Sequence, residues 1–183
     1  MPEQPGHLYP ADLFENAAEL ARDRVWWAVY TKSRQEKIFS RHLASHQIPH
    51  YLPLVQKTYV SCGRKFSARV PLFPGYVFML GSDPERVCSL TSNRVSRILA
   101  VHDPVRLLME LEQVYRLISS GVPLTVEQRL APGNRVRVKH GALAGMEGIV
   151  RVRRGKTRLI VTVSFLQQGA SVEVDDFNLE PLD

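Results

Sequence analysis

Hydrophobic positions in the first two thirds of the chain switch repeatedly between the spacing of strands and that of helices. Short runs rich in aromatic and β-branched residues predict strands at residues 25–30, 51–60, 66–70, 71–80 and 95–101. Apolar residues spaced three and four apart predict helices at residues 32–46, 83–90 and 104–119. Because strands alternate with helices, we expect an α/β sandwich in which helices cover one sheet.

The pattern changes near residue 122, where a polar stretch containing Pro123 predicts a linker. Beyond it, apolar residues alternate with polar ones in short runs separated by glycine, which is typical of a small β-barrel. We therefore expect an α+β chain with four segments. These are an N-terminal extension with a short helix (1–24), an α/β domain (25–121), a linker (122–129) and an all-β barrel (130–183).

Charge and cysteine content narrow the class of protein. The chain has 24 Lys and Arg against 18 Asp and Glu, a net charge of +6 that fits either an anionic partner or ordinary solubilising charge. Cys62 and Cys88 lack C-x-x-C spacing, so neither a disulfide framework nor a thiolate zinc site is indicated. No apolar run reaches the roughly 20 residues of a membrane span, and no secretory leader is recognisable, so we expect a cytoplasmic protein without an anchor.

Catalytic and metal-binding motifs give little support to an enzyme. His42, His46 and His50 recur every four residues, but Pro49 should end the helix before His50 and no acidic residue completes an H-E-x-x-H pattern. Nucleophile-elbow, phosphate-loop and paired-carboxylate patterns are missing from the expected strand-turn-helix contexts. We therefore expect no metal site, no cofactor and no catalytic activity.

Five short motifs occur in the order found in one protein family. They are residues 26–30 (WWAVY), 35–37 (QEK), 72–78 (LFPGYVF), 94–98 (RVSRI) and 138–150 (VKHGALAGMEGIV). The first four resemble landmarks of the N-terminal domain of NusG-type transcription factors, and the last resembles the KOW motif of their C-terminal domain. The resemblance covers residues 25–182 and implies a NusG-type α/β domain followed by an SH3-like KOW barrel.

What the resemblance implies is a non-enzymatic elongation factor. In this family the N-terminal domain binds the clamp helices of the largest RNA polymerase subunit and suppresses pausing, while the barrel recruits a second partner. Tyr30, Tyr76 and Phe78 match the aromatic positions of the polymerase-binding surface. Large rigid aromatic side chains suit such an anchor. The alternative is that Tyr76 and Phe78 belong to the sheet core.

Basic residues form a second expected surface, which can contact phosphates without reading sequence. In the RfaH-like branch the corresponding helix touches non-template DNA, and Lys32 and His42 fall at matching positions, with Arg94 near a DNA-contacting turn. The alternative is a solvated helix face. The complete candidate set is Lys32, Arg34, Lys37, Arg41, His42, Arg64, Lys65 and Arg94.

In the barrel, Phe165 and Leu166 match the apolar pair that NusG proteins present to Rho or to a small-subunit ribosomal protein. The Gly-Arg that usually follows is replaced by Gln167-Gln168, so the resemblance leaves the partner open. The alternative for Phe165 is a place in the barrel core.

Finer features resemble the specialised, operon-restricted paralogues more than the housekeeping factor, namely residues 31–37 and the short hairpin at 61–67. We expect a monomer whose C-terminal region is all-β, because it is rich in Val, Ile and Thr. The competing class is a ribosome-associated RNA-binding protein, in which the KOW barrel and the basic helix would hold structured RNA.

Overall fold

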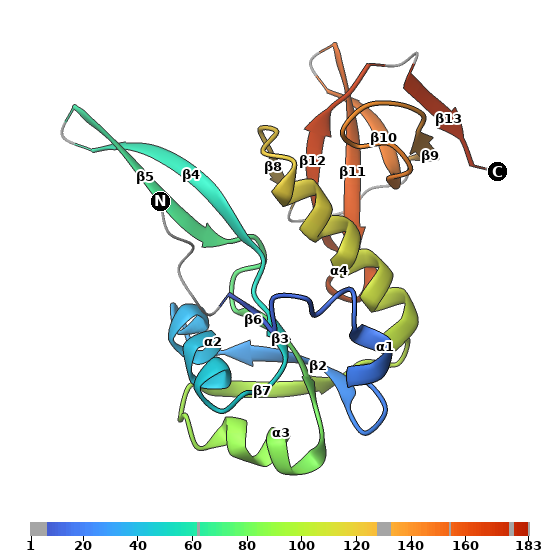
Figure 1. Cartoon of the computed structure of the whole chain (residues 1–183). Helices are drawn as coiled ribbons and strands as arrows, with labels where there is room; N and C mark the ends of the chain where they lie inside the picture. Colours follow the sequence, from blue (N-terminus) through green and yellow to red (C-terminus); the bar gives the residue numbers. More distant parts are fainter. Residues whose placement is uncertain (1–6, 62, 128–132, 154, 176–177, 183) are drawn as a thin grey trace. The chain divides into compact units, whose positions relative to one another are not determined.

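The computed structural model describes residues 7–61, 63–127, 133–153, 155–175 and 178–182 (Figure 1). The chain forms two compact units, Met1–Pro104 and Val105–Asp183. The first holds an antiparallel sheet with helices, and the second holds an all-β sheet with one long helix. The expected fold class, an N-terminal α/β domain followed by an all-β module, is confirmed.

Unit 1 is built on a five-stranded antiparallel sheet in the order β1-β3-β6-β2-β7. Its helices and the separate two-stranded β4–β5 hairpin follow the predicted pattern closely. The elements are β1 (Leu8–Tyr9), α1 (Ala17–Leu20), β2 (Val25–Thr31), α2 (Glu36–Ser45), β3 (His50–Tyr51), β4 (Leu54–Ser61), β5 (Arg64–Pro71), β6 (Tyr76–Gly81), α3 (Asp83–Leu90) and β7 (Val95–Ala100).

The core of unit 1 lies between the sheet and helix α2. Phe39 and Leu43 of α2 are fully buried against Val29 of β2 and Val77 and Met79 of β6. These strand residues alternate, so they share one face of the sheet, and Phe39 and Leu43 lie one helical turn apart. Because the apolar residues of the strands share one face and those of the helix share another, α2 packs against the sheet through these side chains.

The N-terminal extension belongs to unit 1 over its described part. Strand β1 pairs with β3, and Leu13 and Ala17 are buried. The ring of Phe14 meets that of Tyr51 edge-on, with centroids 5.2 Å apart. The short predicted helix is present as α1, and residues 1–6 lie outside the described residues.

Unit 2 contains a six-stranded antiparallel sheet in the order β13-β9-β10-β11-β12-β8. Its inward residues, such as Val138, Leu159, Val161 and Val172, are buried and alternate along their strands. The elements are α4 (Pro104–Ser119), β8 (Thr125–Glu127), β9 (Asn134–Val138), β10 (Glu147–Arg153), β11 (Lys156–Val163), a 3-10 turn (Ser164–Leu166), β12 (Gln168–Glu173) and β13 (Leu179–Pro181).

The boundary between the units differs from the predicted one. Helix α4, which we placed in the α/β domain, groups with the barrel. Gln113 accepts a hydrogen bond from the Glu147 amide at 2.8 Å, and Arg116 donates one to the Ala144 carbonyl at 3.0 Å. An apolar helical stripe does not specify its partner, so these polar contacts could not be foreseen.

The predicted linker also differs, because part of it is a strand. Thr125–Glu127 forms β8 and pairs with Gly169–Ser171 of β12. Residues 128–132, which include the predicted linker end and barrel start, lie outside the described residues.

Candidate functional site

Two tyrosines on neighbouring strands of unit 1 form an aromatic pair. Tyr30 of β2 and Tyr76 of β6 lie directly opposite each other in the antiparallel register, with ring centroids 5.1 Å apart and planes inclined by 53°. Tyr30 is 42% exposed and Tyr76 is partly exposed. Directly opposed positions bring side chains together, so this pair presents one rigid aromatic patch to solvent.

Gly75 lies directly against the ring of Tyr30. Its φ is +86°, and a Cβ at this position would lie 2.5 Å from Cε2 of Tyr30. The tyrosine ring therefore lies on bare backbone, in space that only glycine leaves open. This is a physical reason for the Pro74-Gly75 dipeptide immediately before β6.

The turn that carries Gly75 is held by buried hydrogen bonds. The Gly75 amide donates to Oε1 of Glu36 at 2.8 Å, and Glu36, at the start of α2, is only 8% exposed. The Gly75 carbonyl accepts a bond from the Thr31 amide at 2.7 Å and one from its hydroxyl at 3.3 Å. Strand, helix and turn are thus tied at one point, which fixes the aromatic pair in place.

Phe78, the third aromatic candidate, is fully buried. Its ring meets Phe73 edge-on with centroids 6.0 Å apart, and it is opposite Tyr51 in the register of β3 and β6. Phe78 is therefore a residue of the sheet core, which was the alternative to a place on the polymerase-binding surface. Only Tyr30 and Tyr76 of the three are accessible in this structure.

Three of the basic candidates gather at the turns next to this patch. The Lys32 ammonium donates to Oδ1 of Asn93 at 2.9 Å, the Lys32 amide donates to the Arg94 carbonyl at 2.8 Å, and Nη1 of Arg94 donates to Oε1 of Gln35 at 2.9 Å. The turn before α2 is thereby joined to the turn before β7. Lys32, Arg34 and Arg94 are exposed there.

The helical candidates are arranged differently. Arg41 is exposed and bonds the Lys37 carbonyl, one turn back on α2. Lys37 is partly buried and its ammonium donates to the Arg69 carbonyl of β5. His42 is turned toward α3, with its Nε2 atom buried, and does not share the exposed face of Arg41.

The β4–β5 hairpin carries an aromatic feature that the sequence reading missed. Tyr59 and Phe66 are opposite each other and their rings stack, with centroids 5.7 Å apart and planes inclined by 18°. They are 48% and 43% exposed, and Arg64 and Lys65 lie exposed beside them at the hairpin tip. The signal that could have found this surface was one aromatic residue in each arm of the predicted hairpin, with the basic pair Arg64-Lys65 between them in the sequence.

The barrel candidates lie in the 3-10 turn between β11 and β12. Phe165 is 36% exposed, Leu166 is partly exposed, and Gln167 ends the turn at φ +53°. Ser164 anchors this turn to α4, because its amide donates to Oε2 of Glu110 at 2.8 Å and its hydroxyl to Oε1 at 2.6 Å. The apolar pair is therefore presented from a turn that a buried carboxylate holds.

The histidine series separates as the predicted helix end suggested. His50 is fully buried in β3, within hydrogen-bond distance of the Ser40 hydroxyl and the Ile48 carbonyl, at 2.8 Å each. His42 on α2 and His46 at the C-terminal cap of this helix lie together, with ring centroids 4.3 Å apart. Burial, followed by the neighbouring His46, lowers the pKa of His42, and a contact with the Cys88 carbonyl acts weakly in the opposite direction.

An ion pair fixes the start of α3. The guanidinium of Arg24 grips both carboxylate oxygens of Glu85, at 2.8 to 3.1 Å, and Glu85 also accepts bonds from the amide and hydroxyl of Ser82. Burial raises the pKa of Glu85, but these hydrogen bonds outweigh it and hold the pKa below its ordinary value. Glu85 thus caps the helix and orients it at once.

Residues 24–131 match the sequence profile of the family described as "Transcription termination factor nusG". The chain belongs to the NusG family. The match spans more than half of the 183 residues and contains the tyrosine pair, the basic turns and the hairpin. NusG family proteins are non-enzymatic transcription factors. The surfaces described above therefore lie within the residues that match a transcription factor family.

Comparisons beyond the family profile show more distant likeness. A structure described as "Domain interaction in Thermotoga maritima NusG" is 18% identical, covering 89% of this chain and 99% of its own, with a TM-score of 0.47. A structure of an MjSpt4:Spt5 complex is 16% identical, covering 86% and 97%, with a TM-score of 0.28. No curated protein sequence matches the chain. Among the described helices, none is both long enough and apolar enough to cross a membrane.

Proposed function

We propose that this chain is a transcription elongation and antitermination factor that binds RNA polymerase through unit 1, suppresses pausing and recruits a second partner through its barrel. The observation that carries this proposal is the exposed Tyr30–Tyr76 pair on the family-matched domain. Its expected contact is the clamp helices of the largest polymerase subunit.

The physical argument rests on pre-organisation. Tyrosine buries a large area with few rotatable bonds, so little conformational entropy is lost when it docks. Here the rings are held further by each other and by the turn that Glu36 and Thr31 tie down. Binding hot spots combine such rigid aromatic anchors with a surrounding that excludes water. The pair has the size and rigidity that a helical ridge on a partner requires.

The basic residues support contact with nucleic acid next to that anchor. Lys32, Arg34 and Arg94 are exposed at the turns beside Tyr30, and Arg41 is exposed on α2. Charge of this kind holds a strand through its phosphates and gives no sequence reading by itself. We propose that these residues contact the exposed non-template DNA strand, with His42 outside the contact because its ring faces α3.

The hairpin extends this second contact. Stacked aromatic rings beside positive charge are typical of surfaces that hold single-stranded nucleic acid, since bases stack on the rings while phosphates meet the cations. Tyr59 and Phe66 with Arg64 and Lys65 provide both parts. We therefore include the hairpin tip in the nucleic-acid surface.

For the barrel, we propose that Phe165 and Leu166 bind the second partner, with a small-subunit ribosomal protein and Rho as the two classes to test. The turn is partly exposed and is held rigidly by Glu110. Gln167 and Gln168 stand where the family usually has Gly-Arg, so a change of partner preference is expected here.

The test is a binding measurement with purified RNA polymerase and the full chain. The double variant Tyr30→Ala/Tyr76→Ala should lose at least about tenfold in affinity, since hot-spot anchors contribute roughly 2 kcal/mol or more. Val87→Ala is the matched control, because Val87 is also exposed in unit 1, at 54%, and lies on α3. Equal binding by polymerase that lacks the clamp-helix tip would refute the proposed contact, and co-sedimentation with ribosomal subunits alone would favour the RNA-binding class.

A further inference from the structure

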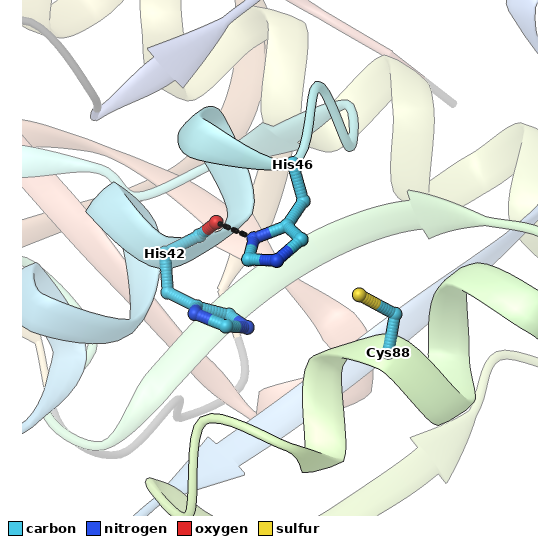
Figure 2. A group of neighbouring side chains, drawn as sticks. All are labelled: His42, His46 and Cys88. Atoms are coloured by element: carbon cyan, nitrogen blue, oxygen red, sulfur yellow. Dashed lines mark hydrogen bonds between the residues drawn. The ribbon is translucent and has the colours of Figure 1, made fainter.

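Three side chains with metal-binding atoms meet between helices α2 and α3 (Figure 2). They are His42 on α2, His46 at the C-terminal cap of α2 and Cys88 on α3, and one ligand atom from each lies within 4.8 Å of the other two. Two helices that are far apart in the sequence therefore supply two nitrogens and one sulfur to the same small volume. The nucleic-acid and polymerase surfaces do not require this arrangement.

His42 has a buried nitrogen that the described protein atoms do not satisfy. Its Nε2 atom is buried and, among the described residues, has no hydrogen-bond partner. Leaving a buried polar atom unpaired is unfavourable, so a ligand that bonds to this nitrogen would be stabilising.

The ring of His46 is oriented by a hydrogen bond through its other nitrogen, Nδ1. Its Nδ1 atom lies 2.9 Å from the His42 carbonyl oxygen, which can only accept, so Nδ1 carries the proton (Figure 2). The Nε2 atom then holds a free lone pair. Histidine ligands of metals commonly have their second nitrogen bonded to a backbone carbonyl in this manner, which fixes the tautomer and the ring orientation.

Cys88 completes the set from the other helix. It is partly buried and packs against the core of unit 1. Its side chain points toward the two imidazole rings in Figure 2. The thiol is a soft donor whose sulfur binds zinc as the thiolate.

We propose that His42, His46 and Cys88 form a binding site for a borderline-soft divalent cation, with Zn²⁺ as the natural occupant. Zinc takes nitrogen and sulfur ligands at about 2.0–2.3 Å in tetrahedral geometry, which places the ligand atoms roughly 3.3–3.8 Å from one another. Closing from a spread of 4.8 Å takes a shift of about 1 Å, within reach of the exposed His46 side chain. Magnesium and calcium prefer oxygen ligands and do not fit this set.

Binding of the zinc ion releases one proton. The Cys88 thiol loses its proton to solvent as the sulfur–zinc bond forms, while both imidazoles bind as neutral rings. Three protein ligands leave a fourth position for water. The bound ion would join α2 to α3, and so would hold α2, which carries Arg41 and Lys37, against the helix that Arg24 and Glu85 orient.

The test uses Co²⁺ as a spectroscopic probe on the full chain. We expect visible bands of tetrahedral cobalt together with a thiolate-to-cobalt charge-transfer band, and competition by Zn²⁺. Cys88→Ser should abolish the charge-transfer band, and His46→Ala should weaken binding on the order of 100-fold or more. The matched controls are Cys62→Ser and His140→Gln, which change the other cysteine and an exposed histidine of the barrel unit.

Folding is checked separately: all variants are first compared without metal by circular dichroism and thermal unfolding. Zn²⁺ should then raise the unfolding temperature of the wild-type chain and of both controls, and leave that of Cys88→Ser unchanged. The proposal is overturned if the wild-type chain binds neither ion more tightly than the millimolar range, if bound cobalt is octahedral without a thiolate band, or if Cys88→Ser binds as the wild type does.

Discussion

Replacing Gly75 by alanine should damage the aromatic surface while leaving the fold intact. At φ +86° a residue with a Cβ is strained by about 1–2 kcal/mol. The new Cβ would also lie 2.5 Å from the Tyr30 ring, which must move because the backbone turn is held by Glu36 and Thr31. Loss of the Tyr30–Tyr76 contact adds about 0.5–1.5 kcal/mol, so we expect a total destabilisation of roughly 1.5–3.5 kcal/mol.

Gly63→Ala separates the two effects. Gly63 has a similar φ of +73° but nothing within 4 Å of its virtual Cβ, so this variant carries the backbone strain alone, about 1–2 kcal/mol. Both variants are measured by urea unfolding and by binding to polymerase free of nucleic acid. Gly75→Ala should bind at least about tenfold more weakly than Gly63→Ala, because only the former displaces an anchor.

A double variant, Gly75→Ala/Tyr30→Ala, tests the mechanism. Without the ring, the added methyl group meets no obstacle from Tyr30, so the further destabilisation caused by Gly75→Ala should fall to the strain alone. If Gly75→Ala and Gly63→Ala bind polymerase equally well, or if the effect of Gly75→Ala is the same with and without the Tyr30 ring, the reasoning about this patch is refuted.

Two further predictions concern charge. The pKa of Glu85 is lower in the folded chain than its ordinary value, so its stabilising contribution is present above about pH 4.5 and is lost as pH falls through the folded pKa. Arg24→Ala should therefore reduce stability near pH 7 by about 1–3 kcal/mol and flatten the acid-induced loss, as thermal unfolding against pH would show; an unchanged slope would contradict this. Arg64→Gln/Lys65→Gln should lower the salt dependence of binding to single-stranded DNA by about 1.4 in log–log slope, and an unaltered slope would remove the hairpin tip from the nucleic-acid surface.

Most elements of unit 1 could be predicted because local pattern and tertiary environment agree there. The run at β2 is apolar and β-branched, and α2 and α3 follow apolar spacing with clear ends at Pro49 and at the Ser82–Glu85 cap. The bounds of α4 were predicted well, yet its partner was not. A stripe of leucines predicts that one face of a helix is buried, but it does not identify the unit against which that face packs.

The site was harder to predict for a related reason. Alternation along a strand places Tyr76 and Phe78 on the same face, but it does not tell whether that face is covered at each point. Here Phe78 is fully buried, while Tyr76 is partly exposed. Cross-strand features such as Tyr59 with Phe66 need the register of the hairpin. The His42–His46–Cys88 cluster needs the packing of two helices, and the motif spacing of either helix alone pointed away from a metal site.

The most direct test of the account is a transcription elongation assay with purified polymerase on a template with defined pauses. The wild-type chain should shorten the pauses, Tyr30→Ala/Tyr76→Ala should lose this effect at concentrations where Val87→Ala retains it, and polymerase without the clamp-helix tip should not respond. An equal effect of the wild type and the double tyrosine variant, or a full response of the truncated polymerase, would contradict the central claim that the tyrosine pair is the polymerase anchor.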